Sequence, residues 1–390
     1  MKNVVFVLCI MAVFLIKPKA QGIEFFHGSW QEALAKAKAE DKLLFVDAFA
    51  KWCGPCKAMA KNVFTQQKVG DFFNANFINL KLDMEEADGV TFGHKYPVSA
   101  YPTLFFLDGD GKVIRNIKGG QQPDGLISHG AEAIKKNDKS GKFEEKYNAG
   151  DRSYDLVFGY VKALNAAGKP SLKVSNDYLY SNPAISDEQR LKFIMEAAVD
   201  ADSRLFDLVI TNKEKIIDLM GQQVFDEKCR SACQVSVKKA AEFEMENLLN
   251  ETIDKAKKTI PNEAEVFAAK SEMLFYKSMN NKQKYISAYK FLAKKSSKNA
   301  DQLQFIIKDI TGSFKENKDM ISDAADYAET LFNLKNEMET LNIYCSVLVL
   351  NKEVDKAIDV VKKQKDKAEK DGQDVSGYDG LLNYLNSKKA

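Results

Sequence analysis

Residues 43–61 read LLFVDAFAKWCGPCKAMAK: an apolar run typical of a buried strand, two cysteines separated by two residues, and a segment compatible with a helix. Where a strand leads into a helix, the helix points unpaired backbone N–H groups and the positive end of its dipole at the first cysteine. Both favour the thiolate over the thiol, so we expect Cys53 to be the nucleophile of a redox dithiol. Cys56, one helical turn further on, is placed to attack the mixed disulfide that Cys53 forms and to release the product.

Two other interpretations of this cysteine pair remain open. A structural zinc site needs about four ligands, and the chain offers no second Cys-x-x-Cys half-site near the first. The three histidines, His27, His94 and His129, show no ligand spacing and none is marked by sequence as a general base beside Cys53. A purely structural disulfide is the second alternative. The strand-to-helix context favours the redox dithiol over both, and we expect no metal and no cofactor.

From about residue 23 to 136 the chain resembles the thioredoxin family. The resemblance is carried by Trp52-Cys53-Gly54-Pro55-Cys56-Lys57, by Asp47 six residues before the first cysteine, and by Tyr101-Pro102-Thr103 opening the apolar run 104–107. It implies a thioredoxin-like α/β fold for this segment. The stretches 62–65 and 71–73 are more similar to the thioredoxin-like domains of exported bacterial thiol:disulfide oxidoreductases than to cytosolic thioredoxin.

The resemblance also assigns roles to residues of this chain. It implies a catalytic set of Cys53, Cys56, Asp47 and Pro102, and a substrate-binding set of Trp52, Gly54, Pro55, Tyr101 and Thr103. Pro102 is expected to be cis and to face the dithiol, while Asp47 helps to move the proton of the resolving cysteine. The chain departs from the family in one place: Asn79 stands where thioredoxins carry a lysine, and Lys81, on the same strand face, is the candidate to replace it.

The first twenty residues predict export. Lys2 is followed by an apolar run over 4–16 and by a small residue, Ala20, at a potential cleavage point. The run is shorter than the roughly 20 residues that span a bilayer comfortably. We therefore expect a cleaved signal peptide over 1–20 and a periplasmic or secreted protein without stable membrane insertion, an uncleaved anchor being the alternative.

Length and charge set the rest of the organisation. With 390 residues and a formal net charge of +2, the chain is longer than one ordinary domain and has no charge excess that would suggest nucleic-acid binding. We expect a thioredoxin-like domain over 21–137, a polar linker over 138–150 and a helical domain over 151–390. Within the first domain, the pattern predicts helices over 30–40 with Ser29 as N-cap, over 53–63, over 65–73 capped by Thr65, and over 124–136, and strands over 43–49, 77–82, 104–107 and 113–117.

Beyond residue 151 the apolar residues recur at helical spacing. Three helix pairs are expected, at 262–278 with 282–295, 300–314 with 319–332, and 336–350 with 354–368. Their spacing is near that of tetratricopeptide-like hairpins, so the helical domain is expected to be either a repeat-like solenoid or an irregular bundle. Cys229 and Cys233, four residues apart on one helix, are either a disulfide or close thiol pair stapling a helix end or two unlinked thiols, and a second redox centre is the third alternative. Cys345 is expected in the core.

Two function classes follow. The first is an exported thiol:disulfide oxidoreductase that reduces protein disulfides through Cys53 and Cys56 and is itself reduced by an upstream electron donor such as a membrane thiol reductase. The second is a helical protein-interaction scaffold that uses the thioredoxin-like domain as a binding or chaperone module. The complete Cys-Gly-Pro-Cys motif favours the first, because a module used for binding alone has no need of two thiols at this spacing.

Overall fold

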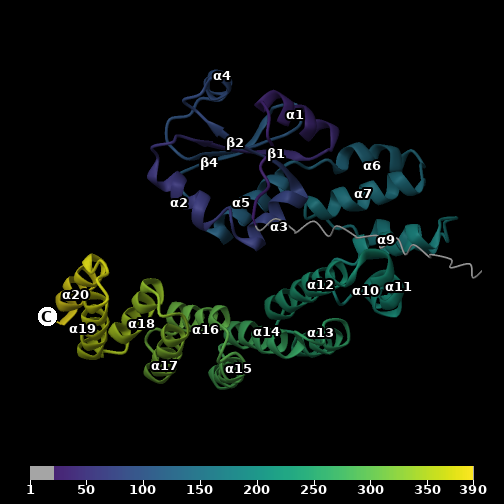
Figure 1. The fold of residues 1–390 in the computed structure, drawn as a ribbon. Coiled ribbons are helices and arrows are strands. Elements are labelled where there is room, and N and C mark those ends of the chain that lie inside the picture. The colour runs from purple at the N-terminus through teal and green to yellow at the C-terminus, as the bar shows by residue number, and fades with distance from the viewer. Residues whose placement is uncertain (1–21, 390) are drawn as a thin grey trace, which may run out of the picture. The chain divides into compact units, whose positions relative to one another are not determined.

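The computed structural model describes residues 22–389 and divides into two compact units, with the boundary between Pro183 and Ala184 (Figure 1). The first unit is a mixed α/β domain extended by helices, and the described part of the second unit consists of helices alone. This arrangement confirms the expected fold class. The expected signal peptide, 1–20, lies outside the described residues.

A four-stranded sheet forms the centre of the first unit. Its strands are β1 (Leu43–Phe49), β2 (Phe77–Asp83), β3 (Thr103–Leu107) and β4 (Val113–Lys118), in the order β2-β1-β3-β4. Strand β1 runs parallel to β2 and antiparallel to β3, which in turn pairs antiparallel with β4. Because β1 lies between two strands and is covered on both faces, its sequence is an almost continuous apolar run.

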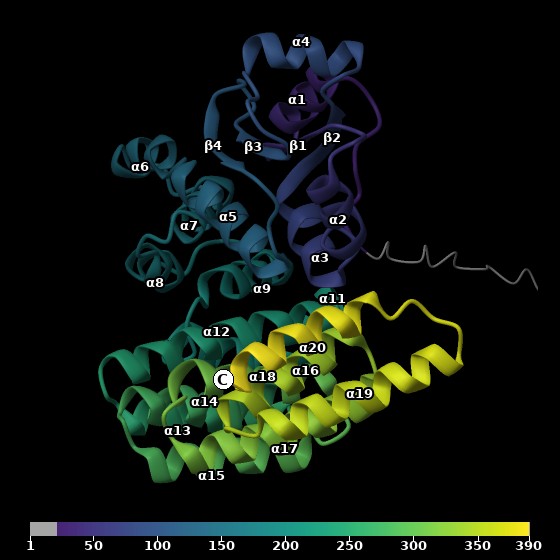
Figure 2. The same ribbon diagram turned by 90° about the vertical axis from the view of Figure 1, so that its left-hand side faces the viewer.

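Helices cover both faces of this sheet (Figure 2). Helices α1 (Trp30–Ala39) and α4 (Ala87–Lys95) pack on the face that carries Leu44, Val46 and Ala48. The opposite face, with Leu43 and Phe45, is covered by α2 (Gly54–Asn62), α3 (Gln67–Asn76) and α5 (Pro123–Lys136).

The second of these cores is built on phenylalanines. The Phe45 ring lies 4.7 Å from that of Phe73 and 5.3 Å from that of Phe106, measured between centroids. Each buried ring of this kind removes a large apolar area from water and contributes about 2 to 3 kcal/mol. This core therefore anchors strand β1 and, with it, the start of α2.

Local signals account for several element boundaries. Ser29 caps α1 in a capping box with Glu32, as expected. The hairpin between β3 and β4 turns at Asp108, whose side chain accepts the backbone N–H groups of Asp110 and Lys112. Thr65 was expected to cap the next helix, and this was wrong: α3 begins at Gln67, and the Thr65 hydroxyl instead donates to the Lys61 carbonyl at 2.7 Å.

The segment expected to be a linker, 138–150, is largely helical. It contains α6 (Ser140–Asn148), which is followed by α7 (Tyr154–Ala166) and α8 (Leu172–Tyr180), and all three belong to the first compact unit. Lys139 pairs with Asp41, and Lys169 pairs with Asp138 at 2.6 Å. The polar residues that suggested a linker thus make ion pairs within the unit.

Apolar side chains also join these helices to the domain before them. A cavity of about 340 Å³ is lined in part by Leu43 of β1, Ile134 of α5, Phe143 of α6 and Ala163 of α7. The position that faces Phe143 is Gly159, where an added Cβ would lie 2.6 Å from the phenylalanine ring. The first unit therefore extends beyond the expected boundary at residue 137.

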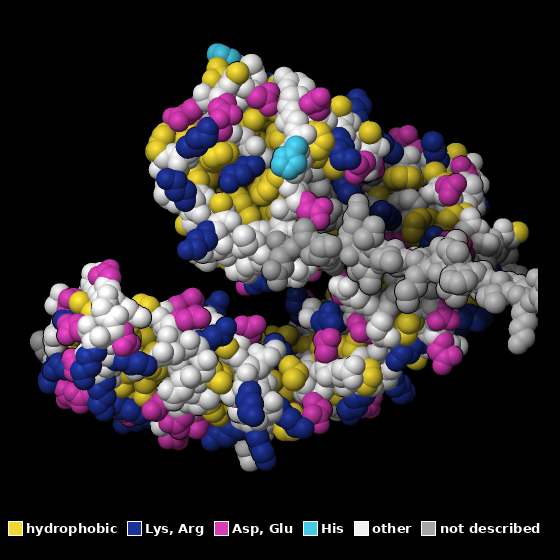
Figure 3. All heavy atoms as spheres, in the orientation of Figure 1, with side chains coloured by type: hydrophobic (Ala, Val, Ile, Leu, Met, Phe, Trp, Pro, Cys, Tyr) yellow, Lys and Arg dark blue, Asp and Glu magenta, His cyan; other side chains and the backbone are white. Residues whose placement is uncertain are grey.

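The second unit is a series of helices that contact mainly their neighbours in chain order. Its elements are α9 (Asp187–Ala197), α10 (Arg204–Thr211), α11 (Lys213–Met220), α12 (Gln222–Glu242), α13 (Glu246–Thr259), α14 (Ala264–Ser278), α15 (Lys282–Lys295), α16 (Ala300–Ser313), α17 (Lys318–Lys335), α18 (Met338–Leu350), α19 (Val354–Lys370) and α20 (Ser376–Lys389). The three expected pairs are present as α14 with α15, α16 with α17, and α18 with α19. Contact restricted to near neighbours is typical of stacked helical repeats. On the face seen in Figure 3, basic and acidic side chains of this unit are interspersed.

Buried tyrosines and more exposed lysines meet at shared carboxylates between these helices. Asp309 of α16 accepts a hydrogen bond from the Tyr285 hydroxyl at 2.8 Å and pairs with Lys277 of α14. Asp323 of α17 is bound in the same way by Tyr289 and Lys290 of α15. These groups link helices that are not part of the same pair.

The cysteines of the second unit are all free thiols. Cys229 and Cys233 lie in the middle of α12 and Cys345 lies in α18, and each is buried. Burial raises the pKa of each of these thiols to about 12. The structure thus favours two unlinked thiols at Cys229 and Cys233, and it confirms the core position of Cys345.

Candidate active site

The dithiol lies at the junction of β1 and α2, as the sequence predicts, and is in its oxidised form. Cys53 and Cys56 are joined by a disulfide, with their Cα atoms 5.3 Å apart. Cys53 is the N-cap of α2, and its Sγ accepts the backbone N–H of Cys56 at 3.1 Å. In this form Sγ belongs to the disulfide. After reduction the same atom is a thiol or thiolate, and the N–H group would stabilise its negative charge.

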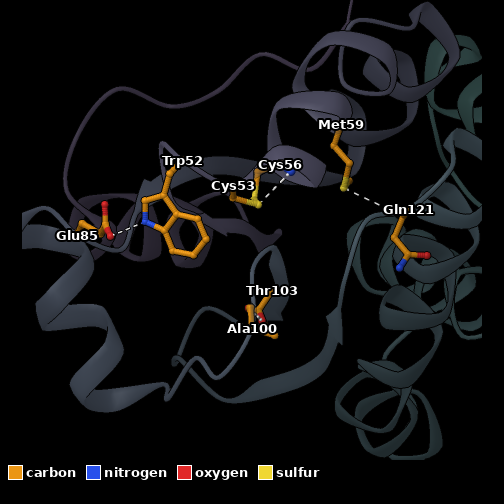
Figure 4. The surroundings of a disulfide bond; sticks show 8 residues. All are labelled: Trp52, Cys53, Cys56, Met59, Glu85, Ala100, Thr103 and Gln121. Atoms are coloured by element: carbon orange, nitrogen blue, oxygen red, sulfur yellow. Dashed lines mark hydrogen bonds between the residues drawn. A yellow bond between two sulfur atoms is a disulfide. The ribbon is translucent and has the colours of Figure 1, made fainter. Parts of the chain in front are cut away.

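The surroundings leave little of the disulfide exposed. Cys53 and Cys56 are each 3% exposed, whereas Gly54 and Pro55 between them lie on the surface. Figure 4 shows the Trp52 indole beside the cysteine pair. The Tyr101 ring packs edge-on against this indole, with 5.7 Å between the ring centroids. The predicted contact residues Trp52, Gly54, Pro55 and Tyr101 are therefore gathered around the dithiol.

The segment before β3 supplies the remaining predicted residues. The Tyr101–Pro102 peptide bond is cis, and the Pro102 carbonyl accepts the backbone N–H of Gly119 at 2.8 Å. Thr103 is buried, and its hydroxyl donates to the Ala100 carbonyl at 2.7 Å (Figure 4). The Thr103 side chain thus holds the loop in place and does not face solvent, while the role of Pro102 stays a prediction.

Asp47 is the one buried carboxylate on the face of β1 that α2 covers. It is 1% exposed, and neither of its carboxyl oxygens has a hydrogen-bond partner among the described residues. Burial raises its pKa from 3.8 to about 7, and the positive charge of Lys81 offsets part of that rise. Such a pKa allows the carboxyl group to take and give a proton near neutral pH.

Lys81 is the cation closest in register to Asp47. The two residues are paired across the parallel strands β1 and β2, so their side chains emerge on the same face. The Lys81 ammonium lies 4.6 Å from the centre of the Phe49 ring. Asn79, by contrast, bonds to the Asn74 side chain and the Glu24 carbonyl. The positions therefore support Lys81 as the charge that acts on Asp47.

One residue beside the dithiol was not anticipated from the sequence. The Trp52 indole N–H donates to Glu85 Oε1 at 2.7 Å (Figure 4). Glu85 lies two residues beyond the end of β2, and helix α4, which was also missed, follows Glu86. Parallel strands end at the same sheet edge, so the acids after β2 could have been placed near the residues that follow β1.

Within 22–389, no group of three or more His, Cys, Asp or Glu side chains is arranged to hold an ion.

Comparison with known proteins settles the family. Residues 26–109 match a family model described as thioredoxin-like. A thioredoxin H-type from Ricinus communis is 32% identical over 96 residues, which are 25% of this chain and 75% of that protein. The chain belongs to the thioredoxin family. Its thioredoxin domain is also 29% identical over 104 residues to the thiol:disulfide interchange protein DsbD of Pseudoalteromonas atlantica, covering 26% of this chain and 17% of DsbD.

Among solved structures, a protein from Bacteroides thetaiotaomicron described as a disulphide-isomerase is 46% identical. It covers 30% of this chain and 95% of its own, with a TM-score of 0.28. Across six matching thioredoxins the chain spans 42% to 75% of the relative's length. All of these similarities concern the thioredoxin domain, which accounts for less than a third of the chain.

Proposed function

We propose that this protein is an exported thiol:disulfide oxidoreductase that reduces disulfides in other proteins. The observation that carries the proposal is the position of Cys53 as the N-cap of α2, with its sulfur accepting the Cys56 N–H. A helix N-terminus lowers the pKa of a thiol and makes it a better nucleophile near neutral pH. The relatives named as thioredoxins and as a thiol:disulfide interchange protein support the reaction class.

The proposed reaction has two thiol–disulfide exchanges. The Cys53 thiolate attacks one sulfur of the substrate disulfide, forms a mixed disulfide with it and releases the other substrate sulfur as a thiolate. The Cys56 thiol then loses its proton, with Asp47 as the proposed acceptor, and attacks the Cys53 sulfur. The second substrate thiol leaves, and the chain is left with the Cys53–Cys56 disulfide. Two electrons have passed from the chain to the substrate.

A reducing direction requires a supply of electrons. Each turnover leaves the Cys53–Cys56 disulfide, and an upstream dithiol donor has to open it again. Export adds to this need, because compartments outside the cytoplasm are oxidising. The charged and then apolar start of the sequence supports export. We propose a membrane thiol reductase as the donor. In the part of the chain that the structure describes, no helix is long and apolar enough to cross a bilayer.

The test is an insulin reduction assay with the full chain and two variants. Cys53→Ser is expected to abolish turnover, since it removes the nucleophile. Cys56→Ser is expected to accumulate mixed disulfides with its substrates, because the second exchange cannot occur. Cys345→Ser is the matched control, because Cys345 is a buried free thiol in α18 and takes no part in the proposed exchange. This variant should keep full activity. Turnover that survives Cys53→Ser would refute the mechanism.

The direction is tested separately by the reduction potential of Cys53 and Cys56, measured against glutathione or dithiothreitol buffers. A potential near that of thioredoxins, about −270 mV, supports a reductase. A value near about −120 mV, typical of strong oxidants, would assign the protein to disulfide formation instead.

A further inference from the structure

The Trp52 indole is the largest exposed apolar group at the dithiol. The residue is 66% exposed, and among the described residues the indole N–H makes one hydrogen bond, to Glu85 Oε1. The Tyr101 ring makes a second contact with the indole, packing edge-on against it. An exposed aromatic side chain with no such bonds would sample several rotamers. Here two contacts select one orientation.

Glu85 is itself anchored to the end of the sheet. Its backbone N–H donates to Asp83 Oδ1 at 3.1 Å, and Asp83 ends strand β2 with its side chain 7% exposed. The other Asp83 oxygen lies 3.3 Å from the Lys51 ammonium. Lys51 pairs in addition with Glu86. The position of Glu85 is therefore tied to a buried carboxylate, and the orientation of Trp52 follows from it.

We propose that Glu85 is a positioning residue that fixes the Trp52 indole beside the dithiol and thereby favours protein disulfides over small disulfides. The physical reason is the entropy of binding. A polypeptide that lies across the dithiol covers the indole and has to immobilise it, whereas a small disulfide can reach Cys53 without touching the ring. An indole that is already fixed loses less freedom when a polypeptide binds. The inference rests on the proposed function, since it concerns the choice of disulfide substrate.

Three variants separate the hydrogen bond from the charge. Glu85→Met removes both, and Glu85→Gln keeps an oxygen that can accept the indole N–H but removes the charge. Glu86→Met is the matched control, because the Glu86 side chain pairs with Lys51 and not with the indole, and the Asp83 carboxylate that holds Glu85 keeps its contact with Lys51 in this variant. Each full-length chain is reduced beforehand, and its second-order rate constants with insulin and with hydroxyethyl disulfide are compared.

We expect Glu85→Met to lower the ratio of the insulin rate constant to the hydroxyethyl disulfide rate constant by about threefold to tenfold, as for one hydrogen bond at an exposed site. Glu85→Gln should keep most of the wild-type ratio, and Glu86→Met should have the same ratio as wild type. An unchanged ratio in Glu85→Met overturns the inference. If Glu85→Gln lowers the ratio as much as Glu85→Met does, the charge of Glu85 and not its hydrogen bond sets the ratio, and the inference is overturned.

Acrylamide quenching of tryptophan fluorescence tests the positioning step without any turnover. The chain has two tryptophans, and Trp30 is 8% exposed, so the quenching reports mainly on Trp52. Quenching should increase in Glu85→Met and stay near the wild-type value in Glu85→Gln. Equal quenching in all variants would show that Glu85 does not hold the ring. A wild-type chain that reduces neither disulfide would refute the proposed function and the selectivity with it, while the quenching experiment would still decide whether Glu85 orients Trp52.

Discussion

Replacing Asp47 with asparagine should make the first unit more stable at alkaline pH. The carboxyl group is buried without a hydrogen-bond partner among the described residues, and its pKa is raised from 3.8 to about 7. Asparagine has nearly the same shape and carries no charge at any pH. The substitution therefore removes the cost of burying a carboxylate and changes little else that depends on pH.

The sign and size of the effect follow from the pKa. Below pH 3.8 Asp47 is protonated in both the folded and the unfolded chain and contributes no pH-dependent cost. As the pH rises, the unfolded chain releases the proton first, so the wild-type protein loses stability until the folded pKa of about 7 is passed. Each pKa unit corresponds to about 1.4 kcal/mol, so the full cost is on the order of 4 kcal/mol. We expect the stability difference between Asp47→Asn and wild type to grow by up to that amount between pH 4 and pH 8.5.

Urea unfolding of the oxidised full-length chain measures this difference. Both tryptophans, Trp30 and Trp52, lie in the first unit, so their fluorescence follows the unfolding of that unit alone. Effects of the amide that do not depend on pH cancel when the two pH values are compared. Asp124→Asn is the control, because the Asp124 side chain is 82% exposed. A stability difference that stays constant from pH 4 to pH 8.5 would contradict the reasoning.

Three further predictions use other contacts. Lys81→Met should raise the pKa of Asp47 above about 7, because the Lys81 charge lowers that pKa. The loss of stability with rising pH should then extend to higher pH. The control Lys57→Met should not change it. Tyr285→Phe should destabilise the helical unit by about 1 to 3 kcal/mol in urea unfolding followed by circular dichroism, since it removes the hydroxyl that donates to the Asp309 carboxylate. The exposed Tyr384→Phe should have little effect. In the reduced native protein a thiol reagent should modify Cys53, whose thiolate the N-terminus of α2 stabilises, well before Cys229, Cys233 and Cys345, because burial raises the pKa of those three thiols to about 12. Rapid labelling of the three would show that α12 and α18 open in the native state.

The centre of the first domain could be predicted because its signals are local. The apolar run of β1, the cysteine spacing and the capping residue Ser29 each act within a few residues, and the structure confirms the elements they predict. The helix pairs after residue 262 were also predictable, since apolar spacing persists through each helix.

The missed features depend on contacts distant in sequence. Segment 138–150 is polar and contains Gly141, and nothing local shows that Lys139 would pair with Asp41 or that Phe143 would find Gly159. Glu85 bonds to Trp52, 33 residues earlier, because β1 and β2 end side by side. The roles assigned to Asp47, Pro102 and the residues around the dithiol came from the family resemblance and stay predictions until variants are measured.

The helices α6 to α8 bear on how this protein can be divided for experiments. A fragment that stops at residue 137 would uncover Leu43 and Ile134, which line a cavity together with Phe143 and Ala163. Newly exposed apolar surface of this kind promotes aggregation. A soluble redox fragment should therefore extend to Pro183, and a shorter one that precipitates would say nothing about the chemistry of the dithiol.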